Sequence, residues 1–153
     1  MLPDATVAKS ILADAGVSAK VEQTTLGLVC HIERADQAPA ALAALRDSEL
    51  DFRMLVDFLG TDAGDDVEIT YHLRSLSRDE EIYIKAHVPF DGEISSVWNV
   101  FAAALLPERE TAELFGLTLS GHPNPKRLLT TEGIEPLLRK SVPVRTAEEV
   151  RAR

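Results

Sequence analysis

Two neighbouring stretches of the chain decide its fold: residues 67–74 read VEITYHLR, and residues 82–88 read IYIKAHV. In both stretches apolar side chains alternate with polar ones, which is the pattern of a strand with one buried face. The residues between them, 75–81, are mostly polar and indicate a turn. The pattern therefore predicts an antiparallel hairpin that turns one face toward a core.

Further elements are expected on both sides of this hairpin. Before it, the sequence predicts a helix that Asp4 caps, that runs to about Ala15 and that Gly16 ends, followed by strands over 17–25 and 26–33. A second helix is predicted over 38–46, with Asp36 as its cap. The segment 52–59 is ambiguous, and we interpret it as a helix continuing into a strand. After it, the sequence predicts a turn at Asp91-Gly92, a helix from Ser95 or Ser96 to Ala104, and a charged helix with Pro107 at its first position and Gly116 past its end.

This order of elements predicts an α+β fold, with an antiparallel or mixed sheet and helices packed on one face. The length of 153 residues fits one domain, which we place at residues 1–141, with residues 142–153 as a C-terminal strap. No apolar run approaches the roughly 18 residues of a membrane span, and the start of the chain lacks the features of a secretion signal. We therefore expect a cytoplasmic protein.

Cysteine content and charge exclude several classes of function. The single Cys30 excludes an internal disulfide and a self-contained iron–sulfur or thiolate zinc site, and we expect it to be an apolar filler in a strand. The net charge of −9 argues against a nucleic-acid partner. Residues 126–153 hold seven Lys or Arg and four Glu, a balance of +3, so the preceding residues carry −12. This basic C-terminal tail is either a solvated end, which composition favours, or a strap for an acidic partner.

Residues 107–130 read PERETAELFGLTLSGHPNPKRLLT and place several charged groups on a short helix and on the rigid loop after it. On the helix, Glu108, Glu110 and Glu113 are expected to be solvated in its first turns or to form an interface ion pair with Arg109. Arg109 is expected to reach either the loop at 121–127 or a carboxylate of a partner. The prolines stiffen the loop. His122 is expected either to bond the loop's own backbone or to contact a neighbouring protein.

The sequence predicts no catalytic, cofactor-binding or metal-binding residues. It contains no Gly-rich phosphate loop, no G-x-S-x-G motif and no H-E-x-x-H motif. His72 and His87 both fall on the polar side of the hairpin and could be neighbours, but without an evident third ligand we interpret them as solvated strand histidines rather than a metal pair.

Several motifs resemble a known family. The motifs in residues 107–130 are Glu108-Arg109-Glu110, Glu113, Phe115-Gly116, Gly121-His122-Pro123 and Arg127-Leu128-Leu129. Further motifs are Tyr71-His72-Leu73-Arg74-Ser75, the stretch Ser95 to Trp98, and Pro136 to Lys140 with Pro143. Together they resemble the family of the 30-kDa subunit of NADH:quinone oxidoreductase (respiratory complex I) and its relatives in membrane-bound [NiFe] hydrogenases. Quinone-reductase members usually have Asp at the position of Glu113, which keeps the hydrogenase-type assembly open.

The resemblance implies a cofactor-free accessory subunit in the peripheral arm of a membrane-associated, proton- or ion-translocating oxidoreductase. The implied partners are the large subunit (49-kDa or hydrogenase-large type) and the small subunit that carries Fe-S clusters, at the cytoplasmic face of the inner membrane and without a membrane span in this chain. The alternative is a stand-alone adaptor that shares the fold. The expected partner-binding residues are Glu108, Arg109, Glu110, Glu113, Gly121, His122, Pro123, Lys126, Arg127, Arg139 and Lys140.

Overall fold

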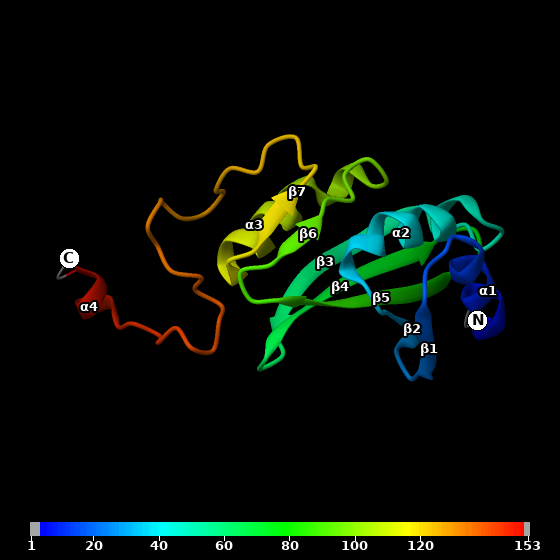
Figure 1. Ribbon diagram of the computed structural model, residues 1–153, viewed down its shortest axis with the longest axis horizontal. Coiled ribbons are helices and arrows are strands. Elements are labelled where there is room, and N and C mark those ends of the chain that lie inside the picture. The colour runs from blue at the N-terminus through cyan, green and yellow to red at the C-terminus, as the bar shows by residue number, and fades with distance from the viewer. Residues whose placement is uncertain (1–3, 152–153) are drawn as a thin grey trace.

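The computed structural model describes residues 4–151 and has a five-stranded sheet with helices packed against one face (Figure 1). The elements are α1 Ala5–Asp14, β1 Ala19–Thr24, β2 Gly27–Ile32, α2 Ala38–Asp47, β3 Met54–Asp62, β4 Asp66–Ser75, β5 Glu80–Pro89, β6 Glu93–Ser95, α3 Leu105–Phe115, β7 Thr118–Ser120 and α4 Ala147–Arg151. Short 3-10 turns precede α2 at Ala35–Gln37 and α3 at Ala102–Ala104. The α+β class predicted from the sequence is confirmed.

The sheet is mixed, with strand order β1-β2-β5-β4-β3. β4 and β5 form the predicted antiparallel hairpin, in which Tyr71 lies opposite Ile84 and Ser75 opposite Glu80. β2 lies parallel to β5, whereas β1 and β3 pair antiparallel with β2 and β4 and form the two edges. β6 and β7 form a separate parallel pair.

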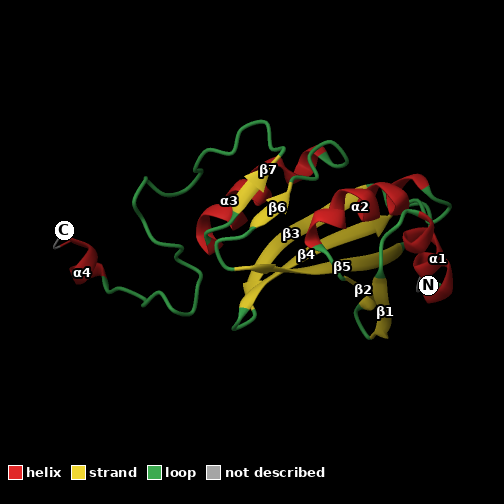
Figure 2. Ribbon diagram, viewed as in Figure 1, coloured by secondary structure: helices red, strands yellow, loops and turns green. Residues whose placement is uncertain are grey.

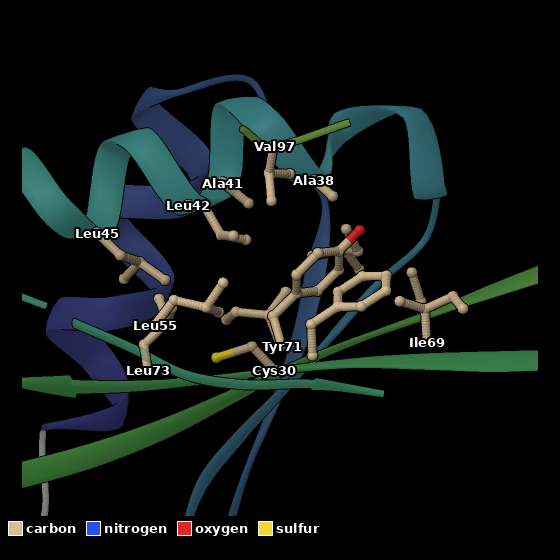
Figure 3. Packing of buried hydrophobic residues seen from close by; sticks show 14 of the residues in the cluster. Cys30, Ala38, Ala41, Leu42, Leu45, Leu55, Ile69, Tyr71, Leu73 and Val97 are labelled. Carbon is tan, nitrogen blue, oxygen red and sulfur yellow. The ribbon is translucent and has the colours of Figure 1, made fainter. Parts of the chain in front are cut away.

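The core lies between the sheet and its helices (Figure 3). The alternating residues of β4 and β5 that were predicted to point inward are all buried: Val67, Ile69, Tyr71, Leu73, Ile82, Ile84, Ala86 and Val88. Leu42 and Leu45 of α2 are fully buried against them. Cys30 is also fully buried in β2, as expected, and burial raises the pKa of its thiol to about 12. It therefore packs as a small apolar side chain.

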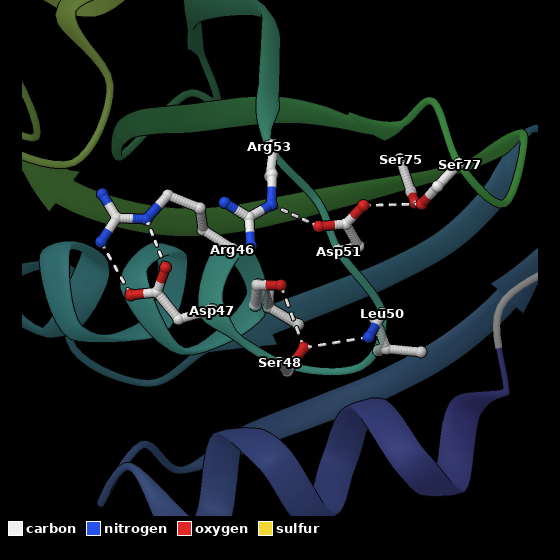
Figure 4. Close-up of polar contacts among 9 residues, drawn as sticks. Arg46, Asp47, Ser48, Leu50, Asp51, Arg53, Ser75 and Ser77 are labelled. Atoms are coloured by element: carbon white, nitrogen blue, oxygen red, sulfur yellow. Dashed lines mark hydrogen bonds and ion pairs between the residues drawn. The ribbon is translucent and has the colours of Figure 1, made fainter.

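The segment at 52–59 is not a helix that continues into a strand. α2 ends at Asp47, and Ser48 then bonds both the Leu45 carbonyl and the Leu50 N–H (Figure 4). Asp51 adopts a left-handed conformation with φ of 54°. Its carboxylate accepts hydrogen bonds from Arg53 and from Ser77 in the β4–β5 turn. This left-handed turn at Asp51 separates α2 from β3, and β3 contains no helical part.

Three other boundaries differ from the predictions. The expected helix from Ser95 to Ala104 is instead the end of β6, a turn and a 3-10 turn, because Ser96 N–H bonds Ser120 O in the β6–β7 region. Pro107 is the third residue of α3, which begins at Leu105, so it is not at the first position. Asp36 pairs with Arg34 and does not cap α2, whose N-cap is Gln37. The caps at Asp4 and Gly16 of α1 are as predicted, with Asp4 accepting from Thr6 N–H and Gly16 at φ of 75°.

Between Ser120 and α4, residues 121–146 have no helix or strand and run along and then away from the rest of the chain (Figure 2). The first part of this segment holds the loop at 121–127. In its later part Arg139 donates to the Phe115 carbonyl, and the Lys140 N–H donates to Asp62. The predicted boundary between a domain at 1–141 and a strap at 142–153 stays a prediction.

Candidate partner-binding site

The polar residues of the motif gather around α3, which packs on β3. Gly60 of β3 permits this contact, because a Cβ there would lie 2.8 Å from Thr111 and 2.9 Å from Phe115. The first and last turns of α3 then face the chain before it and the loop after it. Both glutamates that point inward, Glu108 and Glu113, bind backbone N–H groups of these neighbouring segments.

Glu108 is fully buried at the start of α3. Its carboxylate accepts a hydrogen bond from the Val97 N–H at 2.7 Å and another from the Ser96 hydroxyl. Burial raises the pKa of Glu108, while the bonds from Ser96 and Val97 oppose that rise. The side chain therefore fixes the segment after β6 to α3, in the place where sequence patterning had predicted a helix.

His122 joins the loop after β7 to the same end of α3. Its Nε2 donates to the Leu105 carbonyl at 2.8 Å, and its Nδ1 accepts from the Asn124 N–H at 3.0 Å. A carbonyl only accepts and an amide N–H only donates, so these two partners define the ring tautomer. His122 is buried, with Nε2 3.9 Å from the Glu108 carboxylate. The prediction that it bonds the loop's own backbone is confirmed.

Glu113 holds the next part of the loop through three consecutive backbone N–H groups. Its carboxylate accepts from Leu128 at 2.7 Å, from Leu129 at 3.0 Å, and from both the N–H and the hydroxyl of Thr130. Burial raises the pKa of Glu113, but these hydrogen bonds together outweigh it and lower the pKa to about 2. An ionised carboxylate with several N–H donors is a strong, directional anchor.

Arg109 also binds the loop, from the outer side of α3. Its guanidinium donates to the Lys126 carbonyl at 2.7 Å and to the Arg127 carbonyl at 2.9 Å. Of the two partners expected for Arg109, the structure therefore shows the loop. Arg127 in turn donates to the Thr130 hydroxyl and to the Ile134 carbonyl.

Arg139 closes the other end of α3. It donates to the carbonyls of Phe115 and Gly116, where the helix ends, pairs with Asp91 at 2.8 Å, and lies over the Phe90 ring. A cation suits the unpaired carbonyls at a helix C-terminus. Gly116 has the predicted left-handed conformation, φ of 70°, and a Cβ there would lie 2.6 Å from Arg139 Nη2.

These contacts correct one interpretation of the motif. Glu108 and Glu113 are buried and bound within the chain, so the expectation that they are solvated or paired with Arg109 is wrong. Glu110 is exposed on the same helix, as expected. Of the other expected partner-binding residues, Gly121, Pro123, Lys126, Arg127 and Lys140 are exposed, and Arg109 and Arg139 are partly exposed. Their contact with a partner stays a prediction.

Sequence reasoning missed several residues that complete this arrangement. Trp98 donates from its indole to the Gly121 carbonyl at 3.0 Å, and Ser96 binds Glu108. Asp62, at the end of β3, accepts from the N–H of Lys140. These partners lie 12 to 78 positions apart along the chain, so no local pattern joins them. The match of the stretch Ser95 to Trp98 to the family was the available signal for Ser96 and Trp98, and no sequence pattern indicated Asp62.

The histidines of the hairpin are not neighbours. His72 lies opposite Tyr83 and stacks on its ring, whereas His87 lies opposite Glu68 and bonds Asp66. Within residues 4–151 no group of three or more His, Cys, Asp or Glu side chains is placed to hold a metal ion. The helices of this part of the chain are also too short or too polar to cross a bilayer.

Comparison with known proteins identifies relatives over most of the chain. Residues 31–148 match the model of the family described as respiratory-chain NADH dehydrogenase, 30 Kd subunit. The corresponding NADH-quinone oxidoreductase subunit of Methylobacterium radiotolerans is 34% identical over 96% of this chain and 71% of its own length. Its counterpart in Methylobacterium sp. strain 4-46 is 40% identical over 72% of this chain, which spans about half (54%) of that relative.

A solved structure has the same fold. It is a chain in the membrane-bound sulfane sulfur reductase, an archaeal respiratory membrane complex, with a TM-score of 0.71 over 96% of this chain and 88% of that one, at 20% identity. At this identity the likeness supports the fold alone.

Proposed function

Because the chain belongs to the family of the 30 Kd subunit of the respiratory-chain NADH dehydrogenase, we propose that it is a cofactor-free accessory subunit of a membrane-associated, proton- or ion-translocating oxidoreductase. It docks on the large subunit (49-kDa or hydrogenase-large type) and on the small Fe-S subunit, in the peripheral arm at the cytoplasmic face of the membrane. The Fe-S clusters belong to those partner subunits.

One observation supports the scaffold role: the buried polar residues of the family motif make their hydrogen bonds within the chain and so shape its surface. Glu108, His122 and Glu113 each bind backbone groups, and together they fix the loop after β7 to α3. A buried side chain whose bonds are all made within the chain has no free group with which to act on a substrate. Such residues instead support a rigid surface for a partner.

The surface that they support is apolar at several points. Leu128 and Leu129 follow directly after the carbonyls bound by Arg109, and they are 38% and 61% exposed. Leu137, Leu138 and Val144 are exposed further along the same segment. Exposed apolar side chains gathered on an irregular segment mark a protein-interaction site. We propose residues 121–146 as the main docking segment, with Glu110, Lys126, Arg127 and Lys140 at its edges.

The test is purification of the complex from its native host through a tag on this chain. We expect the large and small electron-transfer subunits, identified by mass spectrometry, to co-purify with stoichiometric iron. The isolated, folded chain is expected to show no iron–sulfur or flavin absorbance. A chain that purifies alone from the host, without cluster-bearing subunits, would support the stand-alone adaptor instead.

A further inference from the structure

The pairing of arginines in this chain is uneven. Ten arginines lie within residues 4–151, and seven of them have a carboxylate within 4.0 Å: Arg34, Arg46, Arg53, Arg74, Arg78, Arg139 and Arg145. Three arginines have no such partner among the described residues: Arg151, in the terminal helix α4, and Arg109 and Arg127, which bond only to carbonyl and hydroxyl oxygens. In a chain with 25 acidic and 16 basic side chains, this shortage of carboxylates is local.

Arg109 and Arg127, the two unpaired arginines outside α4, line the same hollow, which we call the α3 groove. It has a volume of about 370 Å³ and is lined by Arg109, Lys126, Arg127, Ala112, Leu117 and Leu119, among others. The Lys126 ammonium group makes no hydrogen bond or ion pair with the described part of the chain, although its backbone carbonyl is bound by Arg109. The groove thus presents three cations above an apolar floor.

One carboxylate of the chain lines the groove beside the three cations, so the groove keeps a net positive charge. It belongs to Glu113, whose two oxygens are directed to the N–H groups of Leu128, Leu129 and Thr130. Those bonds are made by the ionised form of Glu113, whose pKa is lowered to about 2. Its acceptor capacity is therefore used by the loop.

We propose that the α3 groove binds an acidic segment of a neighbouring subunit, with an Asp or Glu carboxylate reaching Lys126 and the unpaired arginines and an apolar side chain on the floor. Charge complementarity supports this occupant: the groove is cationic on a chain whose first 125 residues carry a net −12, so an acidic partner is attracted here and repelled elsewhere. The inference rests on the proposed function and names the chemistry of one of its contacts.

Carbodiimide cross-linking of the native complex tests the contact directly, because this zero-length reagent joins an amine to a carboxylate only when the two are in ion-pair contact. We expect Lys126 to be joined to an Asp or Glu of a neighbouring subunit, and Lys9, an exposed lysine on α1, to give no such product. A Lys126 cross-link found only within this chain, to a second copy of it, or nowhere would overturn the proposal.

A charge-reversal pair gives a second measurement. Lys126→Glu leaves the carbonyl that Arg109 binds in place, and Lys9→Glu makes the same change in net charge far from the groove. We expect Lys126→Glu to reduce recovery of the neighbouring subunits at least about tenfold at low salt and to flatten the salt dependence, with Lys9→Glu like the wild type. Equal recovery of the neighbouring subunits with both variants would overturn the role proposed for the α3 groove while leaving the proposed function intact.

If the wild-type chain recovers no neighbouring subunit, both proposals are wrong. If the variant loses binding only to vesicles of anionic lipid, the groove recognises a membrane and the proposal is also wrong.

Discussion

The sheet body, residues 4–89, and the loop region, residues 121–140, are held in place by different forces. The sheet body buries a continuous set of apolar side chains, among them Leu42, Leu45, Tyr71 and Ile84. The loop region exposes Leu128, Leu129, Leu137 and Leu138 and is instead held by a few buried or half-buried polar groups. Apolar burial is shared over many contacts, whereas each polar anchor is directional and has no substitute. The two regions should therefore fail in different ways when they are mutated.

The largest effect is expected in the sheet body. Leu42 of α2 is fully buried, so Leu42→Ala removes apolar contacts and leaves a cavity. We expect the free energy of unfolding in urea to fall by about 2–5 kcal/mol. The control is Leu76→Ala, at a side chain that is 71% exposed, which should change it by less than about 0.5 kcal/mol. A loss at Leu42 no larger than at Leu76 would contradict the claim that apolar burial holds the sheet body together.

The second effect concerns Glu108, at the border between the regions. Glu108→Ala leaves the Ser96 hydroxyl and the Val97 N–H without their acceptor in a buried site, and we expect a cost of about 2–4 kcal/mol. Glu108→Gln keeps the shape and one acceptor oxygen. Since burial raises the pKa of Glu108 and so disfavours its charged form, this neutral variant should stay within about 1 kcal/mol of the wild type at pH 7. Chemical denaturation of both variants checks this, and a Gln variant as damaged as the Ala variant would mean that the charge itself is required.

Two glycines that follow helices allow the cost of a left-handed alanine to be measured separately from its contact with Arg139. Gly16 and Gly116 both follow a helix with φ of 75° and 70°, but a Cβ meets nothing within 4 Å at Gly16 and meets both Arg139 and Pro136, at 2.6 Å each, at Gly116. Both Gly→Ala variants should lose about 1 kcal/mol from the left-handed conformation. Gly116→Ala alone should also speed hydrogen exchange at the Leu138 N–H, which bonds the Leu114 carbonyl at 3.0 Å. Unchanged exchange there would show that Arg139 adjusts without releasing the segment.

The smallest change in global stability, and the most local one, is expected for Glu113→Gln. The variant weakens the bonds to Leu128, Leu129 and Thr130, whose amides should exchange at least about tenfold faster, while the unfolding free energy falls less than in Glu108→Ala because the loop can open locally with the sheet body intact. Glu110→Gln, an exposed position on the same helix, is the control. Slower exchange in the variant, or equal effects of the two substitutions, would contradict the role of Glu113.

The same carboxylate predicts a pH dependence with a defined sign. The folded-state pKa of Glu113 is about 2, below its ordinary value of 4.5, so its stabilisation is complete above about pH 4.5 and is lost as the pH falls toward 2. The Thr130 amide resonance should titrate in that window in the wild type and not in Glu113→Gln. A Thr130 resonance that titrates equally in both proteins would assign the change to another group.

The fold was predictable where the pattern was local and repeated. The alternation in residues 67–74 and 82–88 predicted the hairpin and its buried face, and the glycines after α1 and α3 predicted both helix ends. The predictions failed at segments whose structure depends on distant partners. Residues 95–104 have apolar spacing that suits a helix, but the β6–β7 pair and the bond from Val97 to Glu108 select an extended start and a turn.

For the candidate site, the sequence indicated most of the polar residues around α3, and the tertiary structure decided which groups they bind. The acidic and basic side chains of residues 107–130 could be recognised as a motif because their order and spacing resemble those of a known family. Whether a glutamate is solvated or accepts backbone hydrogen bonds depends on which part of the chain packs beside it. Glu113 accepts from Leu128 to Thr130, which lie beside it only because the chain turns back after β7, at His122. Hydrogen bonds over 15 to 17 positions leave no period in the sequence, so their direction is set by the packed structure alone.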